Sequence, residues 1–251
     1  MKATCSGFSA IGSSGLPEMR RVRLLEADGT VWARQGAAWQ IVAPADPGPT
    51  MTFPDWVFDP GRQAFVVIDE VFEPDDGRRS RTRLHDGTTW LDTVIEPGPF
   101  VVDTISRRWG LVYDWSQGGV VVVGQRAYGA HRLDRAATSW LRLPTPPTVG
   151  QTPSFESGTV AYAFDRNRLA LSLGATGPAP GHAVFDLEAE AWVRDFAPQL
   201  NGYRAAGNPA RQSYLLVQSS GTPSFERRAE AWLRLPALAD PTNFGAQVSV
   251  P

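Results

Sequence analysis

The sequence has very little of several residue types on which function often depends. Its 251 residues include a single cysteine, Cys5, so the chain cannot form an internal disulfide. Lys2 is the only lysine among 24 basic residues. No stretch approaches the roughly 18 consecutive apolar residues that a membrane helix needs, so no membrane span is predicted. The formal net charge of -2 gives no electrostatic reason to expect binding to nucleic acid or to an anionic membrane.

The groups that usually carry catalysis are equally sparse. The sequence holds no G-x-S-x-G nucleophile elbow, no phosphate-binding Walker motif and no zinc-type ligand spacing. Its 3 histidines, His85, His131 and His182, precede their nearest turns by different numbers of residues, whereas a shared metal site would want convergent positions. We therefore predict no cofactor and no metal, and we assign no catalytic residue. Enzymatic activity is the less favoured interpretation.

The most informative feature is a short motif around tryptophan that the chain repeats. Its clearest copies read Ala-Glu-Ala-Trp-Leu-Arg at 229–234 and Ala-Glu-Ala-Trp-Val-Arg at 189–194. The repeated tryptophans are Trp39, Trp90, Trp140, Trp192 and Trp232, at intervals of 51, 50, 52 and 40 residues. A period of this size indicates repeat units that stack or stand around an axis.

Each of the last four units has the pattern of two β-hairpins. A first strand ends in an apolar residue or glycine followed by Asp or Asn, then comes a turn, then a short and almost wholly apolar run. These runs lie at 65–68, 120–123, 169–171 and 214–217. Such runs are typical of strands that are buried on both faces. The tryptophan lies in the last strand of the second hairpin, where it would fill the space between neighbouring units.

These patterns predict an all-β protein, a five-bladed β-propeller of four-stranded antiparallel blades. The propeller is expected over residues 20–251, after a flexible segment at 1–19. The first unit has the signals of only three strands. The tail at 244–250 has the composition of a lone strand, so we expect the N- and C-terminal strands to close the ring.

The units resemble kelch repeats, in particular the degenerate repeats of bacterial proteins. The resemblance covers roughly residues 56–236. It is carried by the Asp after the first strand, the aliphatic second strand, the D-x-x-x-x-x-W hairpins at 134–140 and 186–192, and the proline that follows at 144 and 236. The first unit, with Asp-Gly-Thr-Val-Trp at 28–32, is similar to tectonin-type repeats, a propeller family that includes lectins. The resemblance implies a propeller whose loops bind a partner.

Candidate site residues are those that interrupt the repeat in loops. The stretch 69–80 is the longest connection expected within a unit and contains five acids followed by two arginines. It can be read as a solvated loop or as a binding loop. The candidates for contact with a ligand or partner are Asp69, Glu70, Arg78, Arg79, Arg107, Trp109, Arg126 and Tyr128. Asp59, Asp114 and Asp165 recur at turns, where aspartate accepts hydrogen bonds from backbone N–H groups.

The favoured function is a non-catalytic protein-interaction or scaffolding module with a protein partner. A carbohydrate-binding lectin is the first alternative, favoured by 9 tryptophans and the tectonin-like unit. A glycan-active enzyme is the second. It would need two carboxylates about 5–10 Å apart, drawn from Asp55, Asp69, Glu70, Asp103 and Asp195. The sequence does not indicate a cellular compartment.

Overall fold

The computed structural model of the chain is built from β-strands. It describes residues 23–25, 30–35, 38–44, 52–73, 77–95, 101–102, 109–124, 129–136, 138–144, 159–173, 181–186, 189–195, 203–208, 211–218, 224–228 and 231–235. Within these ranges no residue is helical. The all-β prediction is therefore confirmed for the part of the chain that the structure describes.

The strands form five separate antiparallel sheets, which we number in chain order. Sheet 1 contains β1 (Arg23–Leu25), β2 (Val31–Gln35) and β3 (Ala38–Ala43). Sheet 2 contains β4 (Thr52–Asp59), β5 (Ala64–Glu73), β6 (Gly77–His85), β7 (Trp90–Ile95) and the short β8 (Val101–Val102). Sheet 3 contains β9 (Trp109–Asp114), β10 (Gly119–Gly124), β11 (Ala130–Leu133) and β12 (Trp140–Leu143).

The last two sheets repeat the same order of four strands. Sheet 4 contains β13 (Thr159–Ala163), β14 (Arg168–Leu173), β15 (Gly181–Asp186) and β16 (Ala191–Asp195). Sheet 5 contains β17 (Tyr203–Asn208), β18 (Ser213–Gln218), β19 (Phe225–Arg228) and β20 (Ala231–Arg234). In sheets 3, 4 and 5 each strand pairs with the next one along the chain, as two successive hairpins require.

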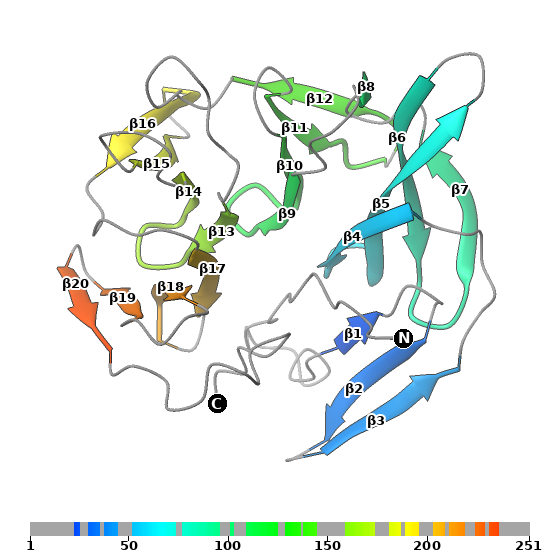
Figure 1. Cartoon of the computed structure of the whole chain (residues 1–251), viewed down its shortest axis with the longest axis horizontal. Helices are drawn as coiled ribbons and strands as arrows, with labels where there is room; N and C mark the ends of the chain where they lie inside the picture. The colour runs from blue at the N-terminus through cyan, green and yellow to red at the C-terminus, as the bar shows by residue number, and fades with distance from the viewer. Residues whose placement is uncertain are drawn as a thin grey trace.

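The sheets stand around a common centre, with the first strand of each repeat innermost (Figure 1). β4, β9, β13 and β17 contact one another in that order around the centre. β7, β12, β16 and β20 lie on the outside. This radial arrangement of four-stranded sheets is that of a β-propeller.

The repeated tryptophans fill the spaces between sheets, as their spacing predicts. Trp90 packs into the apolar cluster between sheets 1 and 2, and Trp140 into the cluster between sheets 2 and 3. Trp192 and Trp232 take the same place between sheets 3 and 4 and between sheets 4 and 5. The indole N–H of Trp140 also donates to the Thr82 hydroxyl at 2.9 Å across the interface. The four tryptophans thus pack each sheet onto the one before it.

The turn of the first hairpin has a common geometry in sheets 2 to 5. Four residues join the two strands, and the fourth has a positive φ: 55° at Gln63, 68° at Gly118, 54° at Asn167 and 48° at Gln212. In sheet 4 these four residues are 164–167, because Ala163 pairs with Arg168. The sequence Arg-Asn-Arg at 166–168 suggests a turn, but it overlaps the observed turn only in part, since Arg168 begins β14.

Two other expected turns are also strands. From the sequence alone a turn would be expected around Glu226 and Arg227, but both residues are paired within β19. The stretch 69–80, expected as a loop, is mostly the paired ends of β5 and β6. Residues 1–19 and 244–250 lie outside the described residues, so the flexible start and the closing strand stay predictions.

Candidate functional site

The charged stretch 69–80 lies mostly in the paired ends of β5 and β6, with the short β8 on the other edge of β6. Asp69 pairs with Arg81, Glu70 with Ser80, and Glu73 with Gly77, which continues the β5–β6 ladder to its end. The pairing of β4 with β5 ends at Glu70, and the pairing of β7 with β6 begins at Thr82. We call residues 71–73 and 77–81 the β5–β6 arm, which extends beyond β4 and β7 of sheet 2 (Figure 1).

The arm brings four of the predicted site residues onto one hairpin. Arg79 pairs with Val71 and Arg78 with Phe72, and on the other edge of β6 the same two arginines pair with β8. Glu70 lies at the base of the arm. Asp69, Glu70, Arg78 and Arg79 therefore occupy paired strands of one hairpin instead of the expected loop.

Asp69 has a structural environment that its sequence context does not suggest. Its side chain is buried, and its carboxylate accepts hydrogen bonds from Arg81 Nη2 at 3.1 Å and Arg81 Nε at 3.4 Å. A buried carboxylate needs such a partner because leaving it unpaired is costly. Asp69 therefore supports the base of the arm and is not a solvated loop residue.

The other candidates are not gathered at this place by the described part of the chain. Trp109 begins β9 and pairs with Gly124 in sheet 3. Arg107, Arg126 and Tyr128 lie outside the described residues. The binding role of all eight candidate residues therefore stays a prediction.

The carboxylates considered for a glycan-active enzyme lie on more than one sheet. Asp55 lies in β4 opposite Ile68, and Asp195 lies in β16 opposite His182, on different sheets. Asp103 lies outside the described residues. Within the described ranges no group of three or more His, Cys, Asp or Glu side chains could hold a metal ion.

Six tryptophans pack inside the protein, whereas a lectin would present tryptophans as exposed platforms for a sugar. Trp56 is buried, and Trp90, Trp140, Trp192 and Trp232 belong to the clusters between sheets. Trp115 packs edge-on against Tyr113 and lies against the cluster between sheets 3 and 4. These six residues serve packing, so the tryptophan count loses its weight as support for a lectin.

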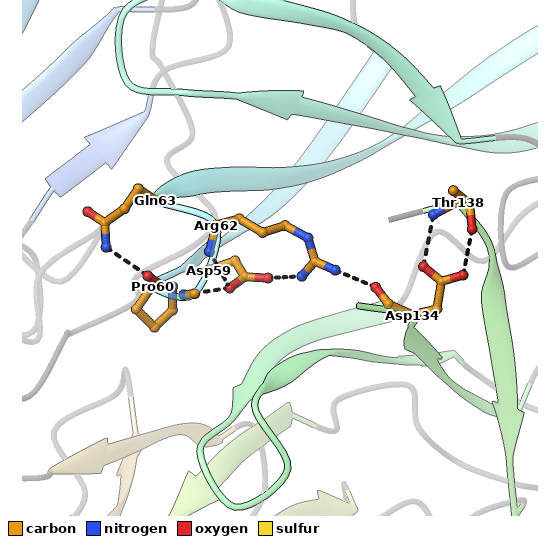
Figure 2. Close-up of polar contacts among 7 residues, drawn as sticks. Asp59, Pro60, Arg62, Gln63, Asp134 and Thr138 are labelled. Atoms are coloured by element: carbon orange, nitrogen blue, oxygen red, sulfur yellow. Dashed lines mark hydrogen bonds and ion pairs between the residues drawn. The ribbon is translucent and has the colours of Figure 1, made fainter. Parts of the chain in front are cut away.

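At the opposite end of the strands from the arm, a polar network joins sheets 2 and 3 (Figure 2). Asp59 Oδ1 accepts from the backbone N–H of Gly61 at 2.9 Å and of Arg62 at 3.2 Å. The Arg62 guanidinium donates both to the Asp59 carboxylate and to the backbone carbonyl of Asp134 in sheet 3. The predicted turn role of Asp59 is confirmed, and its arginine partner also links two sheets.

Asp114 repeats the turn position of Asp59, whereas Asp165 occupies a later position in its turn. Asp114 accepts from the backbone N–H of Ser116 at 3.0 Å and from Arg132 Nη2 at 2.6 Å. Asp165 is the second residue of its turn, whereas Asp59 and Asp114 end their strands. Its carboxylate instead lies 3.5 Å from Arg227 Nε in sheet 5. Asp165 thus lies in a turn, as predicted, but two residues later than Asp59 and Asp114, because the Phe-Asp pair in sheet 4 is displaced by two residues.

The carboxylate of Asp134, in the second-hairpin turn of sheet 3, accepts several local hydrogen bonds. Asp134 accepts from the Thr138 backbone N–H at 2.9 Å and from the hydroxyls of Thr138 and Ser139 at 2.7 Å. The bonds from Thr138 are the largest cause of a pKa lowered to about 2. At neutral pH this carboxylate is ionised and holds the turn.

The turns also carry a repeated arginine that the sequence analysis did not single out. Arg62, Arg166 and Arg211 each occupy the third position of the first-hairpin turn in their sheets. The signal was available in the sequence as an arginine followed by Gln or Asn at 62–63, 166–167 and 211–212. It was read only as turn composition.

Comparison with known proteins identifies structural likeness only. No protein-family model matches the chain, and no curated protein sequence matches it. A structure titled "YCF48 bound to D1 peptide" is 14% identical, covering 92% of this chain and 66% of that chain with a TM-score of 0.49. An auxiliary nutrient binding protein from Bacteroides ovatus is 12% identical, covering 68% of this chain and 37% of that chain with a TM-score of 0.45.

A third structure supports the fold. An auxiliary nutrient binding protein from Bacteroides thetaiotaomicron is 8% identical, covering 92% of this chain and 57% of that chain with a TM-score of 0.55. The chain thus spans less than two thirds of the length of each of these proteins. Within the described ranges, no helix is long and apolar enough to cross a membrane.

Proposed function

We propose that the chain is a non-catalytic interaction module that binds a protein partner through the β5–β6 arm. The observation that carries this proposal is the extension of β5 beyond β4, the strand on its other edge. A ribbon of this kind offers main-chain groups to a partner that adds as a further strand. The described part of β5 pairs only with β6 over Val71–Glu73.

The composition of the arm suits a protein interface. Val71 and Phe72 are apolar, and Arg78 and Arg79 provide guanidinium groups. Aromatic residues and arginine are enriched where proteins bind one another, and charged residues form the polar rim. The buried Asp69–Arg81 pair at the base would hold the arm in one orientation toward the partner.

The proposal also includes the number of blades, the closure of the ring and the type of repeat. We take the domain to be a closed, five-bladed, kelch-like propeller over residues 20–251, with the tail at 244–250 completing the three-stranded sheet 1. A closed ring leaves the sheets no open face, and the result is a rigid body from which an arm can act. The resemblance to bacterial kelch repeats supports this interpretation, and residues 1–19 would stay outside the domain.

The proposal can be tested by site-specific photo-crosslinking. A benzoylphenylalanine is placed at Arg79 on the arm, and a matched probe at Gln117, an exposed turn residue at the other end of the strands. Irradiation in an extract of the source cells is expected to give one discrete protein adduct from the arm probe and none from Gln117. The adduct should disappear when Phe72→Ser and Arg78→Glu are added while the melting temperature stays unchanged.

Two results would contradict the arm as the binding site. Equal labelling from both positions would indicate nonspecific contact. A discrete adduct only from Gln117 would move the partner to the turn face. Binding to a glycan array that survives the arm substitutions would favour the lectin alternative instead of a protein partner.

A further inference from the structure

The outer strand of sheet 1 has one open edge. β3 lies at the outside of this sheet (Figure 1), and within the described residues it pairs with β2 alone. Its ladder with β2 is regular from Ala38 to Ile41 and shifts by one residue beside Val42. On the other edge of this regular run, the main-chain groups face no further strand of the described part, so another chain can pair with them.

The side chains along this edge are well exposed, although most of them are apolar. Four of the six residues of β3 are exposed. Ile41 is 55% exposed and Val42 is 43% exposed. The other large hydrophobic residues at the surface of the described chain lie one to a strand, at Leu141, Val193 and Leu233. Only β3 therefore presents two adjacent exposed apolar side chains among the described strands.

β3 also differs from the other outer strands in charge. Edge strands of natural proteins commonly carry charged residues, which discourage pairing with another chain. The outer strands of sheets 2 to 5, which are β7, β12, β16 and β20, each contain at least one charged residue. β3 reads Ala-Trp-Gln-Ile-Val-Ala and contains none. This protection against pairing is therefore missing from the outer strand of sheet 1.

We propose that β3 pairs antiparallel with β3 of a second copy of this chain, joining the two copies of sheet 1 edge to edge. A two-fold axis sets the central residue of such a strand opposite its own mate, so a charge at the centre would repel itself. Asp92 in β7 and Arg142 in β12 would meet this repulsion, whereas β3 does not. Because β3 has no charge to match a charged partner segment, a second copy is the partner that fits it best.

A pairing centred on Gln40 uses the regular part of the strand. It places Gln40 opposite Gln40 of the second copy, where each side-chain amide can both donate and accept a hydrogen bond. It also places Trp39 opposite Ile41 of the second copy, and aromatic residues form favourable cross-strand pairs with β-branched ones. Since a strand of 6 residues buries only a small area, the dimer should be weak and form at high protein concentration.

This contact is independent of the proposed protein partner. β3 belongs to sheet 1 and the β5–β6 arm to sheet 2, so the arm substitutions Phe72→Ser and Arg78→Glu should leave the dimer intact. Failure of one proposal leaves the other standing. If both hold, the dimer carries two arms, and a partner with two matching sites would bind more tightly than a partner with one. That last consequence alone rests on the proposed function.

Sedimentation velocity of the full chain tests the pairing. With rising concentration up to about 1 mM, the wild type should pass reversibly from monomer to dimer and no further, as a closed two-fold pair requires. Ile41→Lys brings two positive charges close together, so we expect the dimer dissociation constant to rise by about 10-fold or more. Leu141→Lys is the matched control, because Leu141 is 54% exposed on the outer strand β12. It should dimerise like the wild type, and unchanged melting temperatures show that both variants are folded.

Opposite charges at the centre give a second test. Gln40→Lys and Gln40→Glu should each be monomeric alone, whereas their equimolar mixture should form a dimer, because opposite charges in facing positions attract. A wild type that stays monomeric at about 1 mM would overturn the proposal, as would association that continues beyond the dimer. Equal dissociation constants for Ile41→Lys and Leu141→Lys, or a mixture no more associated than its components, would show that β3 is not the contact.

Discussion

The carboxylate of Asp165 in sheet 4 and the guanidinium of Arg227 in sheet 5 form an ion pair across the space between two sheets. Asp165 Oδ2 lies 3.5 Å from Arg227 Nε, and the two side chains are only 2% and 4% exposed. Arg227 also lies over the Trp232 ring, with its guanidinium carbon 5.7 Å from the ring centroid. The tryptophan that packs sheet 5 onto sheet 4 is thus flanked by a buried charge pair.

Removing one member of this pair should cost much stability. Asp165→Ala leaves the Arg227 charge buried, and such losses typically reduce the free energy of unfolding by about 3–5 kcal/mol. Arg168→Ala is the control, because its pair with Asp186 in the same sheet is about a third exposed and should contribute less than about 1 kcal/mol. Urea unfolding of both variants measures the difference. Equal losses would show that burial does not govern the strength of the Asp165 pair.

The sequence predicted the interior of the sheets better than their connections. The 50-residue tryptophan period and the four-residue apolar runs follow from burial on both faces, which acts on every repeat alike. The arm was mistaken for a loop because its composition is strongly charged. The ion pair of Asp69 with Arg81 depends on strand register, which brings together two residues 12 positions apart. Their spacing in the sequence does not reveal this contact.

The position of the turn in sheet 4 is also difficult to predict from local sequence. Phe164-Asp165 looks like Phe58-Asp59 locally, yet the residue with positive φ decides the alignment of the turns. Asn167 corresponds to Gln63 and Gln212, which places Asp165 two residues later than Asp59. The contact between Asp165 and Arg227 joins two sheets, and no spacing in the sequence encodes it.

The fourth turn position offers a prediction about backbone strain. Gly118 has φ of 68° and Gln212 has φ of 48° at equivalent positions. An L-residue with a side chain pays about 1–2 kcal/mol in this region. Gly118→Ala should therefore lower the free energy of unfolding by about 1 kcal/mol, and Gln212→Gly should raise it by up to about 1 kcal/mol. Thermal melts of the two variants should shift in opposite directions; a shift in the same direction would contradict this assignment.

A side chain at position 207 should destabilise the fold, because the space around Gly207 is already filled. It lies in β17, where an added Cβ would overlap the carbonyl oxygen of Tyr162 and come within 2.8 Å of the Phe164 ring in sheet 4. Gly207→Ala is expected to cost about 1–3 kcal/mol, as overpacking does. Gly119→Ala is the matched control, since its Cβ would meet atoms no closer than 3.6 Å. If urea denaturation finds the two variants equally stable, the inner strands do not approach each other as closely as described.

The last prediction concerns the titration of Asp134. Its pKa of about 2 arises first from the backbone N–H and the hydroxyl of Thr138, with a further bond from Ser139. Because the folded pKa is lower than the ordinary value of 3.8, the ionised turn stabilises the fold above that value. The stabilisation is lost as the pH falls through 2. Carbon-detected NMR of the side-chain carboxyl should show this low midpoint in the wild type.

Thr138→Ala keeps the backbone N–H but removes the hydroxyl, so the midpoint of Asp134 should rise part of the way toward its ordinary value. Thr88→Ala in the equivalent turn of sheet 2 is the control. Asp86 accepts there from the Thr88 hydroxyl at 2.9 Å, and that substitution should raise the pKa of Asp86 while leaving Asp134 unchanged. An Asp134 midpoint that does not move in Thr138→Ala would assign the low pKa to the backbone alone. The turn would then be held by its conformation, and the hydroxyl would be dispensable.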